Sequence, residues 1–264
     1  MSPLSTYQTL GIPFRVVFHA INGMSRKELL KSVLQEANGK FRFKLSMHNT
    51  SRIVEGKEIG AFEELSKSRR SIVISNHVGA TDFIVNMQVM DYVNRLDDLR
   101  WVTLKIFENK ISKPVLTKMD ALLLSQKPGP DKVAVKEYAD EHQDPNMTFA
   151  ISIAPEGGIL DKKLYKKCKR VMEKYIHYTF ENMCTPHVGA LEQLINLFPN
   201  ADIFDVTIKY FDKYGSGHTP SNLTNVFIRN TSRFNEYLNC GLMLQSSSRS
   251  SSVATISIGT SRFP

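Results

Sequence analysis

The amino-acid sequence predicts a single α/β domain, with a mostly parallel central sheet flanked by helices. Two observations support this fold class. Along the middle of the chain, short runs of apolar and β-branched residues alternate with stretches in which apolar residues recur at helical spacing. The short runs are almost continuously apolar, which is typical of strands covered on both faces, and strands that alternate with helices usually pair in parallel.

The individual elements follow from these patterns in chain order. Leucine and valine recur at helical spacing over 26–37, and Asn38-Gly39 is a helix stop. The expected strands are 41–45, 71–75, 102–106, 121–125, 148–153, 204–210 and 225–229. The expected helices after the first are 83–96, 108–118, 131–142, 159–176 and 189–197.

The composition is that of a chain with one hydrophobic core. Of the 264 residues, 42% are hydrophobic and 23% are charged, which are ordinary values for a globular domain. We expect an N-terminal helical or interfacial segment over 1–40, an α/β domain over 41–240, and a mobile, serine-rich tail over 241–264.

No apolar run is long enough to cross a bilayer, which takes roughly 18–20 residues. The longest run near the start of the sequence is 12–21, and an arginine and a histidine interrupt it. We therefore expect no transmembrane span and no secretory signal. The run 12–21 either lies in a membrane interface or is buried as a strand or helix.

The charge of the chain indicates an anionic partner. There are 34 Lys and Arg residues against 26 Asp and Glu, which gives a net charge of +8. A nucleic acid, an acidic membrane surface and a phosphate-bearing substrate all fit this sign. The basic run 162–170 either faces such phosphates or is a solvated helix face.

Several other chemistries lack their sequence signatures. The three widely spaced cysteines fit neither a disulfide framework nor a zinc knuckle, and favour a reducing compartment. The seven histidines are scattered without an HExxH motif, so we expect no metal site. Gly215-Ser216-Gly217 lacks the spacing of a nucleophile elbow, and the sequence shows neither a glycine-rich first turn nor an RNP-like strand. We therefore expect no serine hydrolase and no nucleic-acid partner.

The sharpest local motif is SNHVGATD, which begins at Ser75, at the end of the expected strand 71–75. Ligands bind at the carboxyl ends of strands in open α/β sheets. Gly79 permits a sharp turn, and Thr81 would cap the next helix, so the loop could fold the imidazole of His77 onto the Asp82 carboxylate. Such a pair fixes one imidazole tautomer, and His77 would then deprotonate a hydroxyl of the substrate itself. The alternative is that Asn76 and Asp82 only cap the helix while His77 fills a turn.

A second motif, APEGG, follows the expected strand 148–153. Pro155 ends strand pairing, and Glu156 would project at the edge of the sheet. Gly157 and Gly158 would expose backbone N–H groups that can hold a phosphate or a hydroxyl-rich group. The alternative is an ordinary loop.

Together, the two motifs resemble those of the glycerolipid acyltransferase family, which includes the lysophosphatidate and lysocardiolipin acyltransferases. Asn76, His77 and Asp82 match the NHxxxxD motif of that family completely, and residues 155–157 match its Pro-Glu-Gly turn. The resemblance covers about residues 65–230. It implies an acyltransferase-like α/β fold for that part of the chain.

Two further motifs of the family match less fully. Lys105 and Pro114 follow the order of the second motif, and Pro186 stands at the fourth. Gln126 and Ile159 replace the arginines that the family carries in its second and third motifs. Their loss removes bidentate phosphate clamps, which a lysine replaces only as a point charge. The lysines that could supply this charge are Lys105, Lys127, Lys162 and Lys163.

The resemblance implies a reaction and a set of site residues. The reaction is transfer of a fatty acyl group from acyl-CoA to the hydroxyl of a lysophospholipid, with His77 as general base and Asp82 as its partner. The substrate-binding residues would be Asn76, Lys105, Glu156, Gly157 and Gly158. Acyl-CoA would be a co-substrate, with no other cofactor and no metal.

The resemblance also implies partners and a location. The partners would be acyl-CoA, a lysophospholipid and an anionic membrane surface, with no obligate protein partner. The protein would be intracellular and attached peripherally to the cytoplasmic face of a membrane. A non-catalytic lipid- or acyl-CoA-binding protein on the same scaffold is the alternative.

Overall fold

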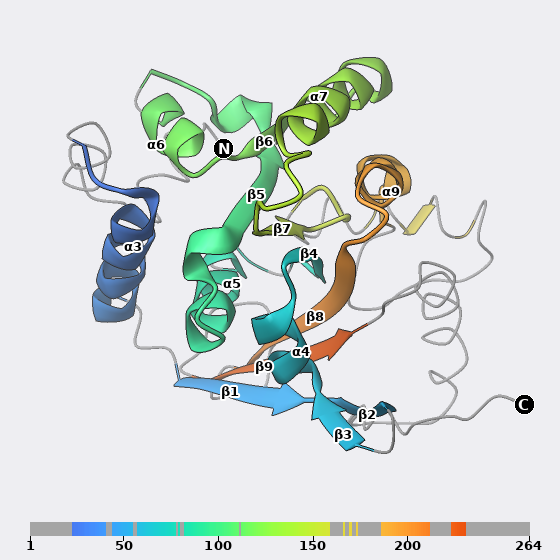
Figure 1. Ribbon diagram of the computed structural model, residues 1–264. Helices are drawn as coiled ribbons and strands as arrows, with labels where there is room; N and C mark the ends of the chain where they lie inside the picture. Colours follow the sequence, from blue (N-terminus) through green and yellow to red (C-terminus); the bar gives the residue numbers. More distant parts are fainter. Residues whose placement is uncertain are drawn as a thin grey trace, which may run out of the picture.

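A seven-stranded sheet with helices on both sides organises the protein (Figure 1). The computed structural model describes residues 23–40, 44–54, 57–77, 79, 82–110, 112–158, 166, 169–170, 173, 186–211 and 223–230. Most of the expected helix 159–176, the run 12–21 and the serine-rich tail lie outside these residues. Within the described part of the chain, no helix combines the length and the apolar character needed to span a bilayer.

The strands pair in the order β1-β9-β8-β4-β7-β5-β6. The five strands from β8 to β6 are parallel to one another, β9 is antiparallel to β8, and β1 is parallel to β9. Their bounds are β1 Lys44–Asn49, β4 Arg70–Ser75, β5 Leu99–Leu104, β6 Leu122–Leu124, β7 Phe149–Ile153, β8 Asp202–Phe211 and β9 Leu223–Asn230. The predicted single α/β domain with a mostly parallel sheet is confirmed for the described residues.

Helices cover the two faces of this sheet separately. In Figure 1, α3, α5 and α6 lie on one side of the sheet, and α7 and α9 lie on the other. The helices are α3 Arg26–Lys40, α4 Ala61–Lys67, α5 Asp82–Tyr92, α6 Lys113–Lys118, α7 Pro128–Glu141 and α9 Val188–Leu197. Two 3₁₀ turns, η1 Leu96–Asp98 and η2 Lys105–Phe107, flank β5, and a small hairpin pairs β2 Ser51–Val54 with β3 Lys57–Gly60.

The two faces of the central strand β7 carry side chains of different size. On β7, Phe149, Ile151 and Ile153 pack in the hydrophobic cluster of α7 and α9, whereas Ala150 belongs to the cluster of α3 and α5. Side chains alternate between the faces of a strand, so this sequence presents bulky residues to one side only. On the α5 side, β7 therefore presents small residues, whereas β8 presents the bulky side chains of Phe204, Val206 and Ile208 to the same cluster.

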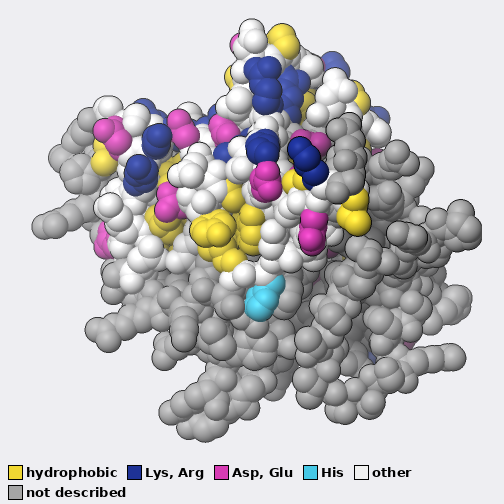
Figure 2. Space-filling view, turned by 60° about the horizontal axis from the view of Figure 1, so that its bottom comes forward, with side chains coloured by type: hydrophobic (Ala, Val, Ile, Leu, Met, Phe, Trp, Pro, Cys, Tyr) yellow, Lys and Arg dark blue, Asp and Glu magenta, His cyan; other side chains and the backbone are white. Residues whose placement is uncertain are grey.

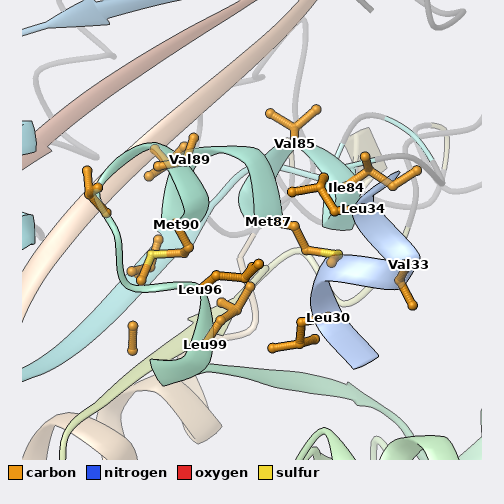
Figure 3. Close-up of a cluster of buried hydrophobic side chains, with 14 of the residues drawn as sticks. Leu30, Val33, Leu34, Ile84, Val85, Met87, Val89, Met90, Leu96 and Leu99 are labelled. Carbon is orange, nitrogen blue, oxygen red and sulfur yellow. The ribbon is translucent and has the colours of Figure 1, made fainter. Parts of the chain in front are cut away.

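Packing between α3 and α5 completes the core on the α5 side (Figure 3). Leu30 and Leu34 of α3 lie next to Ile84 and Met87 of α5, and all four side chains are buried. Full burial of a leucine or methionine side chain contributes about 1.5–3 kcal/mol. The helical spacing of leucine over 26–37 therefore predicted the helix and its buried face. The predicted stop at Asn38-Gly39 was wrong, because α3 continues to Lys40.

Most expected elements match the structure within a few residues, and three of them are displaced. The expected strand 41–45 is found as β1 Lys44–Asn49. The expected strand 102–106 is found as β5 Leu99–Leu104, within which Arg100 forms an ion pair with Asp120 (Nε–Oδ2 2.6 Å). The expected helix 108–118 starts only at Lys113, because the side chains of Asn109 and Ser112 bond each other's backbone N–H groups in a turn. The hairpin β2–β3 and the helix α4 were not predicted.

A buried arginine joins the far end of α5 to the sheet. Arg95 is 5% exposed, and its guanidinium donates five hydrogen bonds of 2.7–3.3 Å. The acceptors are a carboxylate oxygen of Asp98, the hydroxyl of Ser71 and the carbonyl oxygens of Leu65, Arg69 and Phe149. All five N–H groups of the side chain are used, which offsets the cost of burying its charge.

Replacing this arginine should destabilise the whole fold. We expect Arg95→Met to lower the free energy of unfolding by about 3–5 kcal/mol, because it leaves a carboxylate and several buried carbonyl groups without their donor. Urea unfolding followed by circular dichroism measures this loss. Lys132→Met on the exposed side of α7 is the control and should change stability by less than about 0.5 kcal/mol. A loss below about 1 kcal/mol for Arg95→Met would contradict the assignment.

A second polar cluster should make stability depend on pH. Burial raises the pKa of Asp120. The hydrogen bond from His142 (2.8 Å) and the nearby charges of His142, Arg100 and Arg26 lower this pKa by more than burial raises it, so the net shift is downward. The carboxylate therefore stabilises the fold above its ordinary pKa of 3.8, and this contribution is lost as the pH falls below that value. We expect the stability difference between the wild type and Asp120→Asn to be greatest near neutral pH and to shrink below pH 4. Thermal unfolding from pH 7 to pH 3 tests this, and a constant difference would contradict it.

Candidate active site

The segments that the sequence singled out meet at one edge of the sheet. The register pairs Ile74 of β4 with Ile153 of β7, and Trp101 of β5 with Ser152 of β7. Past the strand ends, the N–H of His77 bonds to the side chain of Glu156, and Lys105 follows β5 at the same edge, in the turn η2. This is the carboxyl edge of the parallel strands, where open α/β sheets bind ligands.

A histidine and a carboxylate lie in contact at this edge. The Nδ1 atom of His77 is 2.8 Å from Oδ2 of Asp82. The same carboxylate oxygen accepts the backbone N–H of Gly79 at 3.0 Å, which holds it in the turn. The Asp82 side chain is 4% exposed and that of His77 is 29% exposed, so the carboxylate is enclosed while the imidazole reaches the surface. Thr81, expected to cap α5, lies outside the described residues.

In this geometry Nδ1 of the imidazole is bonded to Asp82, and the second nitrogen, Nε2, is the one that could react with a bound group. A proton on Nδ1 is donated to the Asp82 carboxylate, and Nε2 then keeps its lone pair. The carboxylate also stabilises the imidazolium that forms when Nε2 takes up a proton. The pair can therefore act as a general base toward a group bound at the edge of the sheet.

The side chain of Glu156 accepts a hydrogen bond from the backbone of His77. Its side chain is 3% exposed, and its Oε1 accepts the N–H of His77 at 3.0 Å. The turn after β7 thereby holds the loop after β4. This bond gives Glu156 a role in positioning His77, and its predicted part in substrate binding stays a prediction.

Asn76 fixes the same loop from the other side. Its Nδ2 donates to the carbonyl oxygen of Ile208 at 2.9 Å, and its Oδ1 accepts the N–H of Ile208 at 2.7 Å. The side-chain amide thus continues the β4–β8 ladder beyond the last backbone pair. Both polar ends of the amide are engaged with the strand, so this residue also positions His77.

The turn at Gly157 is held by two further segments. Gly157 has a φ of +66°, which favours glycine, and a Cβ there would lie 3.3 Å from Cδ2 of His187. Gln126 donates from Nε2 to the carbonyl oxygen of Gly157 at 2.7 Å, and the N–H of His187 donates to that of Pro155 at 2.6 Å. Gln126 stands where the resemblance calls for an arginine, and no local pattern predicts its contact with Gly157, 31 positions along the chain.

Lysines supply positive charge along this edge. Lys105 opens η2 directly after β5, Lys127 precedes α7, and both side chains are exposed. Among the described side chains on the face drawn in Figure 2, basic and acidic side chains are interspersed around exposed hydrophobic ones. Among the described residues, no three His, Cys, Asp or Glu side chains gather where they could hold a metal ion.

Comparison with known proteins does not assign the chain to a family. No model of a known protein family matches it, and no curated protein sequence matches it either. The fold and the site together define an α/β protein with a histidine–carboxylate pair at the carboxyl edge of a parallel sheet.

The contact between Glu156 and His77 can be tested without assuming an activity. Glu156→Ala removes the acceptor of the His77 N–H, so hydrogen exchange of this amide should become about 10–100 times faster. Glu156→Gln keeps an oxygen that can accept the same bond, and the exchange rate should rise less than tenfold. NMR hydrogen exchange measures both variants, with the exposed Glu137→Ala as control. Unchanged exchange in Glu156→Ala would contradict the positioning role.

Proposed function

We propose that the protein is an acyl-CoA-dependent O-acyltransferase that acylates the hydroxyl of a lysophospholipid. The observation that carries this proposal is the contact of 2.8 Å between Nδ1 of His77 and Oδ2 of Asp82 at the ligand-binding edge of the sheet. The pair occupies the motif Asn76-His77-(X)₄-Asp82, which resembles that of the glycerolipid acyltransferases. The acyltransferase-like form of the α/β fold belongs to the same proposal.

The chemistry requires a base of this kind. An alcohol has a pKa far above neutral, so its proton must leave as the oxygen attacks the thioester carbonyl of acyl-CoA. Nε2 of His77 takes that proton, and Asp82 stabilises the resulting imidazolium. The tetrahedral intermediate then breaks its C–S bond, and the leaving thiolate takes the proton from His77. The products are the acylated phospholipid and free CoA, and no acyl-enzyme forms.

The surroundings of His77 suit this role. Its backbone is bonded to Glu156 of the turn after β7, and the preceding Asn76 is bonded to β8 on the other side. A base held at a fixed place avoids part of the entropic cost of the reaction. Asn76 and Glu156, which the sequence analysis placed among the substrate-binding residues, thus contribute through His77.

The phosphates of the substrates would be bound by exposed cations and backbone groups at this edge of the sheet. Lys105 offers a positive charge to the phosphates of CoA or of the lysophospholipid. The backbone N–H of Gly157, which was predicted to bind substrate, instead donates to the carbonyl oxygen of Ala154 at 3.1 Å, so only Gly158 of the two glycines remains a candidate donor. Exposed Ile106, which is 65% accessible, lies next to Lys105 in η2. An apolar side chain beside a cation suits peripheral attachment to an anionic membrane, where lysophospholipids reside.

A binding protein without catalysis is the second candidate. It is favoured by Gln126, which stands where the resemblance calls for an arginine and whose amide is bonded to Gly157. A neutral amide engaged with the backbone provides no clamp for a phosphate. Such a protein would hold acyl-CoA or lipid in the same place without transferring the acyl group.

Removing the base should separate the two candidates. We expect His77→Ala to lower the turnover of long-chain acyl-CoA by 10²–10⁴-fold with the fold retained, because proton transfer is lost. Release of the free thiol of CoA measures this, with a panel of lysophospholipids in liposomes as acceptors. His48→Ala on β1 is the matched control and should keep full turnover.

The same assay, combined with a binding measurement, distinguishes an acyltransferase from a binding protein. If the wild type binds acyl-CoA by titration calorimetry but releases no thiol with any acceptor, the acyltransferase proposal is wrong. If affinity for acyl-CoA is equal in the wild type and in His77→Ala while thiol release is lost only in the variant, the acyltransferase proposal is supported.

A further inference from the structure

A small polar cluster lies buried behind the loop of His77, where α5 packs on β4 and β7. Asn86 of α5 is 5% exposed, and Ser75 of β4 and Ser152 of β7 are each 3% exposed. The Nδ2 atom of Asn86 donates to both hydroxyl oxygens at 3.2 Å. Its neighbours along this helix that pack in the same core are apolar, namely Ile84, Val85, Met87, Val89 and Met90.

At this core position, the amide oxygen of Asn86 lowers the stability of the fold relative to an apolar residue. This oxygen, Oδ1, meets no hydrogen-bond partner among the described residues. A buried amide that is only partly bonded costs free energy, and an apolar side chain of similar shape would avoid that cost. The residue therefore calls for an explanation other than the stability of the fold.

Its position offers that explanation. Asn86 lies one helical turn after Asp82 on the same face of α5. Ser75 directly precedes Asn76 and His77, and Ser152 lies on β7 shortly before Glu156. The two N–H groups of one planar amide thus join the helix that carries Asp82 to both strands whose ends hold His77.

The bonds of Asp82 tie the start of α5 to the loop after β4, whereas the two bonds of Asn86 tie the helix to the strands themselves. Apolar contacts between α5 and the sheet are not directional and allow the helix to shift along its axis. A shift of about 1 Å would move the carboxylate of Asp82 out of good hydrogen-bond geometry with the imidazole. Two bonds from Nδ2, one to each strand, oppose such a shift.

We propose that Asn86 is a positioning residue, which sets the height of α5 on β4 and β7 and so keeps Asp82 in contact with Nδ1 of His77. Its effect on turnover rests on the proposed acyltransferase function, but its effect on the imidazole does not. The fraction of the Nδ1–H tautomer of His77 reports the contact directly, because a proton on Nδ1 is favoured only while the carboxylate faces it.

The test compares Asn86→Leu with Met87→Ala in the full chain. Asn86→Leu keeps the side-chain volume and removes both the unbonded Oδ1 and the two bonds to the serine hydroxyls, so its opposing effects on thermal stability should largely cancel. In this variant, ¹⁵N NMR should show that His77 loses its preference for the Nδ1–H tautomer, and kcat should fall about 10–100-fold with little change in KM. Met87→Ala should lower thermal stability but leave the tautomer and kcat unchanged, which separates positioning from packing.

The tautomer of His77 in these variants decides whether Asn86 is a positioning residue. An unchanged tautomer in Asn86→Leu, or an equal loss of the tautomer in both variants, would overturn it. Asn86→Ser keeps one hydroxyl donor and should give an intermediate tautomer shift, so the test stands even if the leucine variant does not fold. If the tautomer shifts in a protein that never releases CoA, the positioning role holds and the acyltransferase function fails.

Discussion

The packing of α5 on β4 and β7 is the constraint on which the rest of this structure depends. The helix shares a hydrophobic cluster with Val73 and Ala150 of these strands, and Asn86 bonds to Ser75 and Ser152. Hydrophobic burial supplies most of the free energy of this contact, but it is not directional. Polar anchors at the two ends of the interface, Asn86 and Arg95, supply the direction, so that one helix joins the core to the site.

The site itself is built mainly from groups that never reach the solvent. Asp82 and Glu156 are both buried, and each accepts a backbone N–H from the loop between β4 and α5. Such bonds offset the cost of burying carboxylates, and they also determine the shape of the loop. The imidazole of His77 is the part that projects outward, so a rigid interior presents a single reactive side chain.

The sequence predicted what depends on local order and missed what depends on register. The meeting of His77 and Asp82 was predictable, because a short turn separates them and the turn follows an apolar strand. The contacts of Gln126 with Gly157 and of Asn86 with Ser152 join segments far apart in the chain. They exist only because the strands pair with a particular register, which composition and periodicity do not specify. A lone asparagine in an apolar helix was the one local signal for the second contact.

The fixed histidine and the flexible lysines at this edge should select different parts of the substrate with different strictness. On the proposed function, the reacting hydroxyl must lie within hydrogen-bond reach of His77, whose loop is bonded on both sides, so little variation is possible there. The phosphate would meet Lys105 and Lys127, which are exposed point charges on flexible stems and impose no planar geometry. Gln126 adds no charge. Discrimination among headgroups would therefore be weak, while the position of the hydroxyl relative to the acyl donor would be strictly selected.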